Sequence, residues 1–173
     1  MNGVMRASTL LASVAVVAAG CEATVDVERF CITQQAIEIP GSLLGLDITS
    51  PYFSLDLTDQ LPLLQTNSTD TDLRVDEVTI TAVTGNPDLS GVTLVRLRAQ
   101  PASGSAVSLA EYQRAPTDPA STALVLSGDD VNIMPYLDSG QANLQLTLSG
   151  RPPRSSWSAD VKTCLHGQGT VSP

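Results

Sequence analysis

The sequence predicts an all-β domain, a sandwich or barrel built from about nine or ten short strands. Apolar and polar residues alternate in most segments, most clearly over residues 142–148, where every even position is apolar. A period of two is typical of a strand with one buried face. Turn residues such as Pro40-Gly41 and Ser139-Gly140 separate these segments, and the period of helices is nearly absent. Many short strands with frequent turns indicate two packed sheets.

The remaining strands follow from the same alternation. It predicts strands at residues 25–28, 44–48 and 53–57, and longer ones at residues 73–83 and 92–99. The alternation of apolar residues changes phase at Asp76-Glu77 in residues 73–83, and near Leu94-Val95 in residues 92–99. A bulge is therefore expected in each of these two strands.

Three other segments lack a clear strand pattern. Residues 131–137 contain Pro135, which predicts a short strand or a single turn. Residues 66–72 and 101–105 are predicted as mobile loops, and the sequence shows no internal repeat and no linker between domains.

Residues 1–20 have the organisation of a secretory signal. One cation, Arg6, precedes an apolar run over residues 10–19 that is broken only by Ser13, and small residues then lead to Cys21. This ending resembles the lipobox of bacterial lipoproteins. The resemblance implies cleavage before Cys21, a diacylglyceryl thioether on its sulfur, and an acyl chain such as palmitate on its new amine.

Two alternative interpretations of this segment stay open. A retained membrane helix would need roughly 20 apolar residues, about twice the length of the run present. Ordinary secretion would leave Cys21 unmodified, and Ala18 stands at the position where a lipobox often has leucine.

Cleavage would leave residues 21–173 as one β-sandwich domain with a short tether. The first strand is expected to begin at about Thr24, so that Glu22 and Ala23 alone would join it to the lipid. Two extended residues place the domain within about 10 Å of the anchor, and its partners at or near the same membrane. In lipoprotein sorting an aspartate after the cysteine often signals the inner membrane, so Glu22 favours the outer membrane.

The strand and turn segments resemble those of small immunoglobulin-like β-sandwich lipoproteins of Gram-negative envelopes. The similarity lies in residues 75–81, 85–90, 134–137 and 144–153, and it covers roughly residues 70–165. It implies a single immunoglobulin-like sandwich of about nine strands and an address in the cell envelope. It implies no catalytic residue.

Three cysteines fit an exported protein. If Cys21 carries lipid, Cys31 and Cys164 remain, and two thiols in an oxidising compartment are expected to pair. A zinc site would require further cysteine or histidine ligands, and only His166 lies near Cys164 in the sequence. We therefore predict a disulfide, no metal and no cofactor.

The balance of charges is acidic. Residues 21–173 hold eight basic and eighteen acidic residues, a formal charge of −10, and no basic cluster. Binding to nucleic acid is disfavoured, because neutralising phosphates requires lysine and arginine. Flat docking on an anionic lipid surface is disfavoured for the same reason, and the acidity is interpreted as keeping the domain soluble.

No motif for catalysis emerges. A Ser-His-Asp hydrolase would have to use His166, and residues 101–105 do not match the Gly-x-Ser-x-Gly elbow. Acidic residues gather at residues 69–77 and at Asp129-Asp130. Calcium prefers oxygen ligands of this kind, but the spacing does not match an EF-hand, and turn chemistry is the favoured interpretation.

The leading functional hypothesis is a non-enzymatic interaction or structural module, anchored to a membrane and bound to an unidentified envelope protein. Trp157 follows a turn-like segment and is a possible contact residue, although packing at a strand edge is favoured. One alternative is an envelope hydrolase that cleaves glycans with a pair of carboxylates. Another is a carrier that holds a small ligand in a cavity of the sandwich or barrel.

Overall fold

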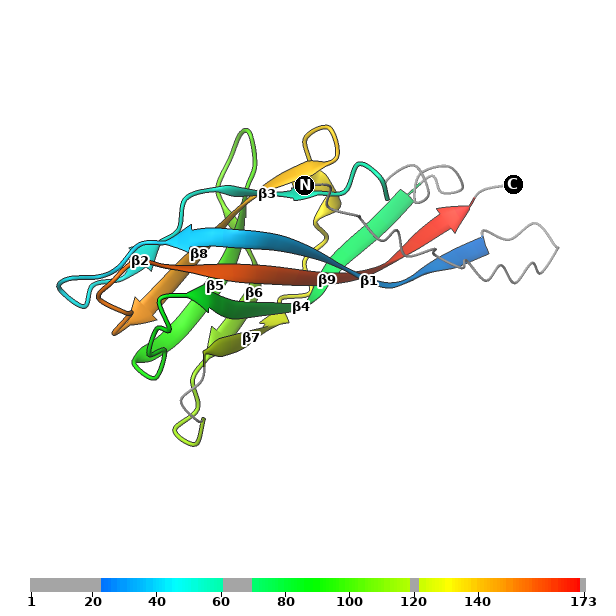
Figure 1. Ribbon diagram of the computed structural model, residues 1–173. Helices are drawn as coiled ribbons and strands as arrows, with labels where there is room; N and C mark the ends of the chain where they lie inside the picture. Colours follow the sequence, from blue (N-terminus) through cyan, green and yellow to red (C-terminus); the bar gives the residue numbers. More distant parts are fainter. Residues whose placement is uncertain (1–22, 61–69, 119–121, 172–173) are drawn as a thin grey trace, which may run out of the picture.

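A computed structural model of the chain describes residues 23–60, 70–118 and 122–171 (Figure 1). These residues form nine strands and one short 3-10 turn, which confirms the prediction of an all-β domain with about nine strands. The elements are β1 (Ala23–Ile39), β2 (Ile48–Thr49), β3 (Phe53–Asp56), β4 (Asp70–Thr84), β5 (Val92–Gln100), β6 (Val107–Gln113), β7 (Ala123–Gly128), the turn η1 (Met134–Tyr136), β8 (Gln141–Gly150) and β9 (Trp157–Val171).

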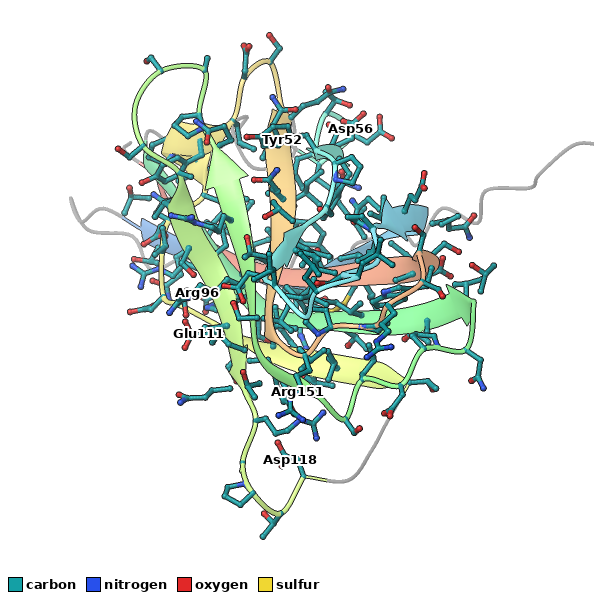
Figure 2. The ribbon with its side chains drawn as sticks, turned by 90° about the vertical axis from the view of Figure 1, so that its left-hand side faces the viewer. Tyr52, Asp56, Arg96, Glu111, Asp118 and Arg151 are labelled. Atoms are coloured by element: carbon teal, nitrogen blue, oxygen red, sulfur yellow. A yellow bond between two sulfur atoms is a disulfide. The ribbon has the colours of Figure 1, made fainter. Side chains whose placement is uncertain are left out.

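The strands form one antiparallel sheet that folds over on itself into two layers. Its order is β1-β9-β4-β7-β6-β5-β8-β2, with β3 paired to β8 beside β2. The strands β1, β9, β4 and β7 make one layer, and their direction crosses that of β5, β6 and β8 in the other (Figure 2). The layers join at β6 and β7, which pair through only two positions, Ala110 with Gly128 and Glu111 with Ser127.

Close packing at this joint requires glycine. A Cβ atom on Gly128 would lie 1.8 Å from the carbonyl oxygen of Val75 on β4. The backbone of β7 therefore approaches β4 more closely than any side chain would permit. Beyond the joint, an ion pair between Arg96 Nε on β5 and Glu111 Oε2 on β6, 2.7 Å long, links two neighbouring strands of the second layer (Figure 2).

The inward faces of the two layers form one hydrophobic core. The predicted alternation of residues 142–148 is confirmed in β8, where every apolar side chain is buried and every polar one faces outward or lies partly exposed. The prediction for residues 53–57 is also confirmed, since Phe53, Leu55 and Leu57 are buried. From the opposite layer, β4 and β9 contribute Leu73, Val75, Val78, Ile80, Val161 and Leu165.

Both expected changes of phase occur at bulges. In β4 the register against β9 shifts between Val75 and Glu77, so Asp76 is the extra residue of a bulge at the predicted position. In β5 the register against β8 shifts between Val92 and Leu94, which places the bulge at Thr93, next to the predicted position. The extra residue lets apolar side chains on both sides of the bulge face the core.

Three local predictions have different outcomes. Residues 131–137 contain the single turn η1, one of the two predicted possibilities. Of the loop predicted at residues 66–72, positions 70–72 belong to β4 and pair with β9, so the loop prediction is wrong there; residues 66–69 lie outside the described part of the chain. The strand predicted at residues 44–48 is mostly a loop, and only Ile48–Thr49 pairs, with β8.

Strand β1 forms one edge of the sheet and runs along the whole molecule. It is paired from Ala23 opposite Val171 to Ile39 opposite Trp157, close to the predicted start at Thr24. Bulges at Glu28-Arg29 and Gln35-Ala36 interrupt it, and Asp160 Oδ1 accepts the N–H of Ala36 at 2.9 Å. Such bulges limit the pairing of an edge with other strands. Figure 1 shows the start of β1 and the loop that follows it at opposite ends of the molecule.

Candidate functional site

The predicted disulfide between Cys31 and Cys164 is confirmed. The two residues lie directly opposite each other on β1 and β9, with their Cα atoms 4.0 Å apart. The bond therefore fastens the edge strand at the start of the domain to the last strand, across a sequence separation of 133 residues.

A charged cluster lies close by on the outer face of β9 and β4, and Arg74 is its centre. Arg74 Nη2 lies 2.6 Å from Asp72 Oδ2, and Arg74 Nε donates to Asp72 Oδ1 at 3.0 Å. The other end of the guanidinium pairs with Asp130, which follows β7. The hydrogen bond that Arg74 donates is the main reason that the pKa of Asp72 lies below its usual value, and the bonds that Arg74 donates to both carboxylates raise its own pKa. We call Asp72, Arg74 and Asp130 the Arg74 cluster.

His166 adjoins this cluster because it is paired with Arg74 across the β4–β9 ladder. The bulge in β4 sets Asp76 near it, with Asp76 Oδ1 3.8 Å from His166 Nδ1, and the bulge in β1 brings Arg29 Nε within 2.8 Å of Asp76 Oδ2. About half of the His166 side chain is exposed. His166 thus lies among ion-paired charges on the surface of the sheet.

A hollow of about 530 Å³ opens over the Arg74 cluster. Its polar lining consists of Asp26, Asp72, Arg74, Asp130, His166 and Gln168. A general acid would need a carboxyl group whose pKa is raised, whereas the pKa of Asp72 is lowered. The hollow is polar, and two of its carboxylates, Asp72 and Asp130, are paired with Arg74.

The acidic residues weighed as calcium ligands are distributed over this surface. Asp72 and Asp130 pair with Arg74, and Asp76 pairs with Arg29. Within the described ranges, no three His, Cys, Asp or Glu side chains gather in a way that could hold a metal ion.

The surface contact considered for Trp157 is wrong, and packing is its observed role. Its side chain is 3% exposed and belongs to the core, because Trp157 begins β9 opposite Ile39. Gly85 leaves room for it, since a Cβ there would lie 3.0 Å from Trp157 Cβ. Cys21 and Glu22 lie outside the described residues.

An exposed apolar loop follows β1, and the sequence prediction missed it. Leu43, Leu44 and Leu46 are 82%, 83% and 64% exposed. We call residues 40–47 the leucine loop. Leu44, Leu46 and Ile48 imitate the alternation of a strand, but the doublet Leu43-Leu44 breaks that pattern and Gly45 adopts a φ of +66°, which favours glycine. These two signals could have identified a loop.

Comparisons with known proteins identify no relative. The sequence matches no protein-family model and no curated protein. Among solved structures, Desmodium yellow mottle tymovirus has a TM-score of 0.41 at 11% identity, covering 95% of this chain and 97% of that one. A decameric BFDV capsid protein has a TM-score of 0.37 at 12% identity, covering 86% and 99%. Such scores carry no information on family or activity.

Proposed function

We propose that this protein is a lipid-anchored protein of the bacterial cell envelope that acts as a non-enzymatic interaction or structural module. The observation that carries the proposal is the position of β1. The paired strand begins at Ala23, two residues after the cysteine of the lipobox-like segment. A lipid on Cys21 would hold the sandwich directly against a membrane.

The disulfide supports export. Bonds of this kind persist in oxidising compartments and are rare in the cytosol. The Cys31–Cys164 bond accounts for two of the three cysteines of the sequence, and the third, Cys21, is the residue that a lipoprotein would modify.

The described surface supports an interaction module over the two alternatives. A glycan hydrolase would use one protonated and one ionised carboxyl, and Asp72, whose pKa Arg74 lowers, could serve only as the ionised one. A carrier would need a cavity with apolar walls. The hollow over the Arg74 cluster is lined mostly by polar residues. Within residues 23–60, 70–118 and 122–171, no helix has the length and apolar character that a membrane span requires.

Fractionation of cells tests the anchor. We expect wild-type protein in the membrane fraction, at the density of the outer membrane because Glu22 follows Cys21. The Cys21→Ser variant should appear as uncleaved precursor or as soluble protein. Release of the wild-type protein as soluble material would contradict the proposal.

A further inference from the structure

We propose that the leucine loop inserts into the lipid bilayer as a second membrane contact, so that the domain touches the membrane at both ends of β1. This inference rests on the proposed function, because it takes the lipid on Cys21 as the first contact. The loop and the start of β1 lie at opposite ends of the same edge strand (Figure 1). Seventeen residues of strand separate them, roughly 50 Å.

The exposure of the loop is unusual for a domain with a complete core. Leu43 and Leu44 are each more than four-fifths exposed, beside an interior in which every apolar residue of β8 is buried. Single exposed leucines are common on soluble proteins, but three within four positions form an apolar projection that marks a contact site.

The backbone of the loop holds the leucines outward. The N–H of Ser42 donates to the carbonyl oxygen of Pro153 at 2.8 Å, and the hydroxyl of Ser42 donates to the carbonyl oxygen of Leu46 at 2.8 Å. A Cβ on Gly41 would lie 2.2 Å from the carbonyl oxygen of Arg154, so the base of the loop is packed directly on the segment before β9. A loop fixed in this way loses little conformational entropy when it binds.

The two arginines beside the leucine loop favour contact with the phosphate groups of lipids. Arg151 and Arg154, both exposed, lie in the segment on which the loop packs, and Figure 2 shows Arg151 at this end of the molecule. Asp47, also exposed, closes the loop. A lipid surface would offer hydrocarbon to the leucines and phosphates to the two arginines. A second copy of this end would oppose like charges.

The anchor favours lipid over a protein groove. A domain tied through Glu22 and Ala23 stays within reach of the bilayer, so insertion of the loop is an intramolecular event with a high effective concentration. A bilayer also requires no complementary shape for a convex loop.

Quenching by lipid tests the inference on the full-length gene product. The protein with Leu44→Cys is extracted from membranes, labelled with a fluorophore at the new thiol and reconstituted into vesicles of phosphatidylethanolamine with a minor share of phosphatidylglycerol. Spin-labelled lipids then serve as the quencher. Val125→Cys is the matched control, because Val125 is 52% exposed and lies on β7, in the middle of the strand order. Non-reducing peptide mapping verifies that the Cys31–Cys164 bond remains.

We expect quenching several-fold stronger at position 44 than at position 125, and weaker quenching at position 44 when Arg151→Gln and Arg154→Gln are added. Equal quenching at both positions, or none at either, would overturn the inference. An apolar environment at position 44 without quenching by lipid would show that protein covers the loop and would also overturn it. The Leu43→Ser/Leu44→Ser variant should still fractionate with membranes, because Cys21 anchors it. The fractionation of this variant therefore tests the anchor separately from the insertion of the loop.

Discussion

Cys31 and Cys164 face each other across β1 and β9, and their bond joins the first strand of the domain to the last. In the chain-entropy model a loop of this length contributes roughly 5 kcal/mol as an upper value. We expect the double variant Cys31→Ala/Cys164→Ala to melt several degrees Celsius below wild type, measured by calorimetry under oxidising conditions. Reductant should lower the Tm of wild type toward that of the variant, and equal melting temperatures would contradict this account.

Truncation of a leucine should cost much more stability in the core than in the leucine loop. Leu146 on β8 is fully buried, so Leu146→Ala should cost about 2–5 kcal/mol of unfolding free energy. Leu44→Ala removes the same atoms from a side chain that is 83% exposed and should change stability by less than about 0.5 kcal/mol. Urea denaturation measures both, and similar costs would show that the loop is packed in solution.

The Arg74 cluster predicts a dependence of stability on pH. Because Arg74 lowers the pKa of Asp72, the contribution of this pair is present above the unfolded value of 3.8 and is lost as pH falls through the lower folded value. We expect Arg74→Gln to reduce the free energy of unfolding at pH 7 and to reduce it by less near pH 2. The exposed Arg98 provides the control, and Arg98→Gln should show no such trend. A constant deficit for Arg74→Gln at both pH values would refute the assignment.

Adding one methyl group at Gly128, where the two layers join, should lower the free energy of unfolding strongly. The Cβ of Gly128→Ala would overlap the carbonyl oxygen of Val75, so the strands must separate where only two positions pair β6 with β7. We expect a loss of more than about 2 kcal/mol, measured by urea denaturation. The neighbouring Ser127→Ala should change stability little, and a tolerated Gly128→Ala would show that the joint can widen.

The strands were predictable where the alternation of apolar and polar residues reflects which side chains are buried. Residues 142–148 and 53–57 alternate because one face of each strand packs into the core. The change of phase at Asp76-Glu77 revealed a bulge because apolar residues on both sides must still point inward. The disulfide followed from the number of cysteines and the expected compartment.

The remaining features depend on contacts that the local sequence does not contain. Arg74 meets Asp130 across 56 positions, so the cluster exists only once the segment after β7 returns to β4. The leucine loop satisfied the alternation of a strand by coincidence, and it is held by Pro153 from the far end of the sequence. Trp157 follows a turn, and its burial depends on pairing with Ile39 at the end of β1.

The most direct test of the proposed function is the intact mass of the protein extracted from bacterial membranes. We predict a chain that begins at Cys21 and carries the added mass of a diacylglyceryl group and an acyl chain, with the Cys31–Cys164 bond intact. A mature chain that begins at another residue, or one that begins at Cys21 without lipid, would contradict the anchor and with it the central claim.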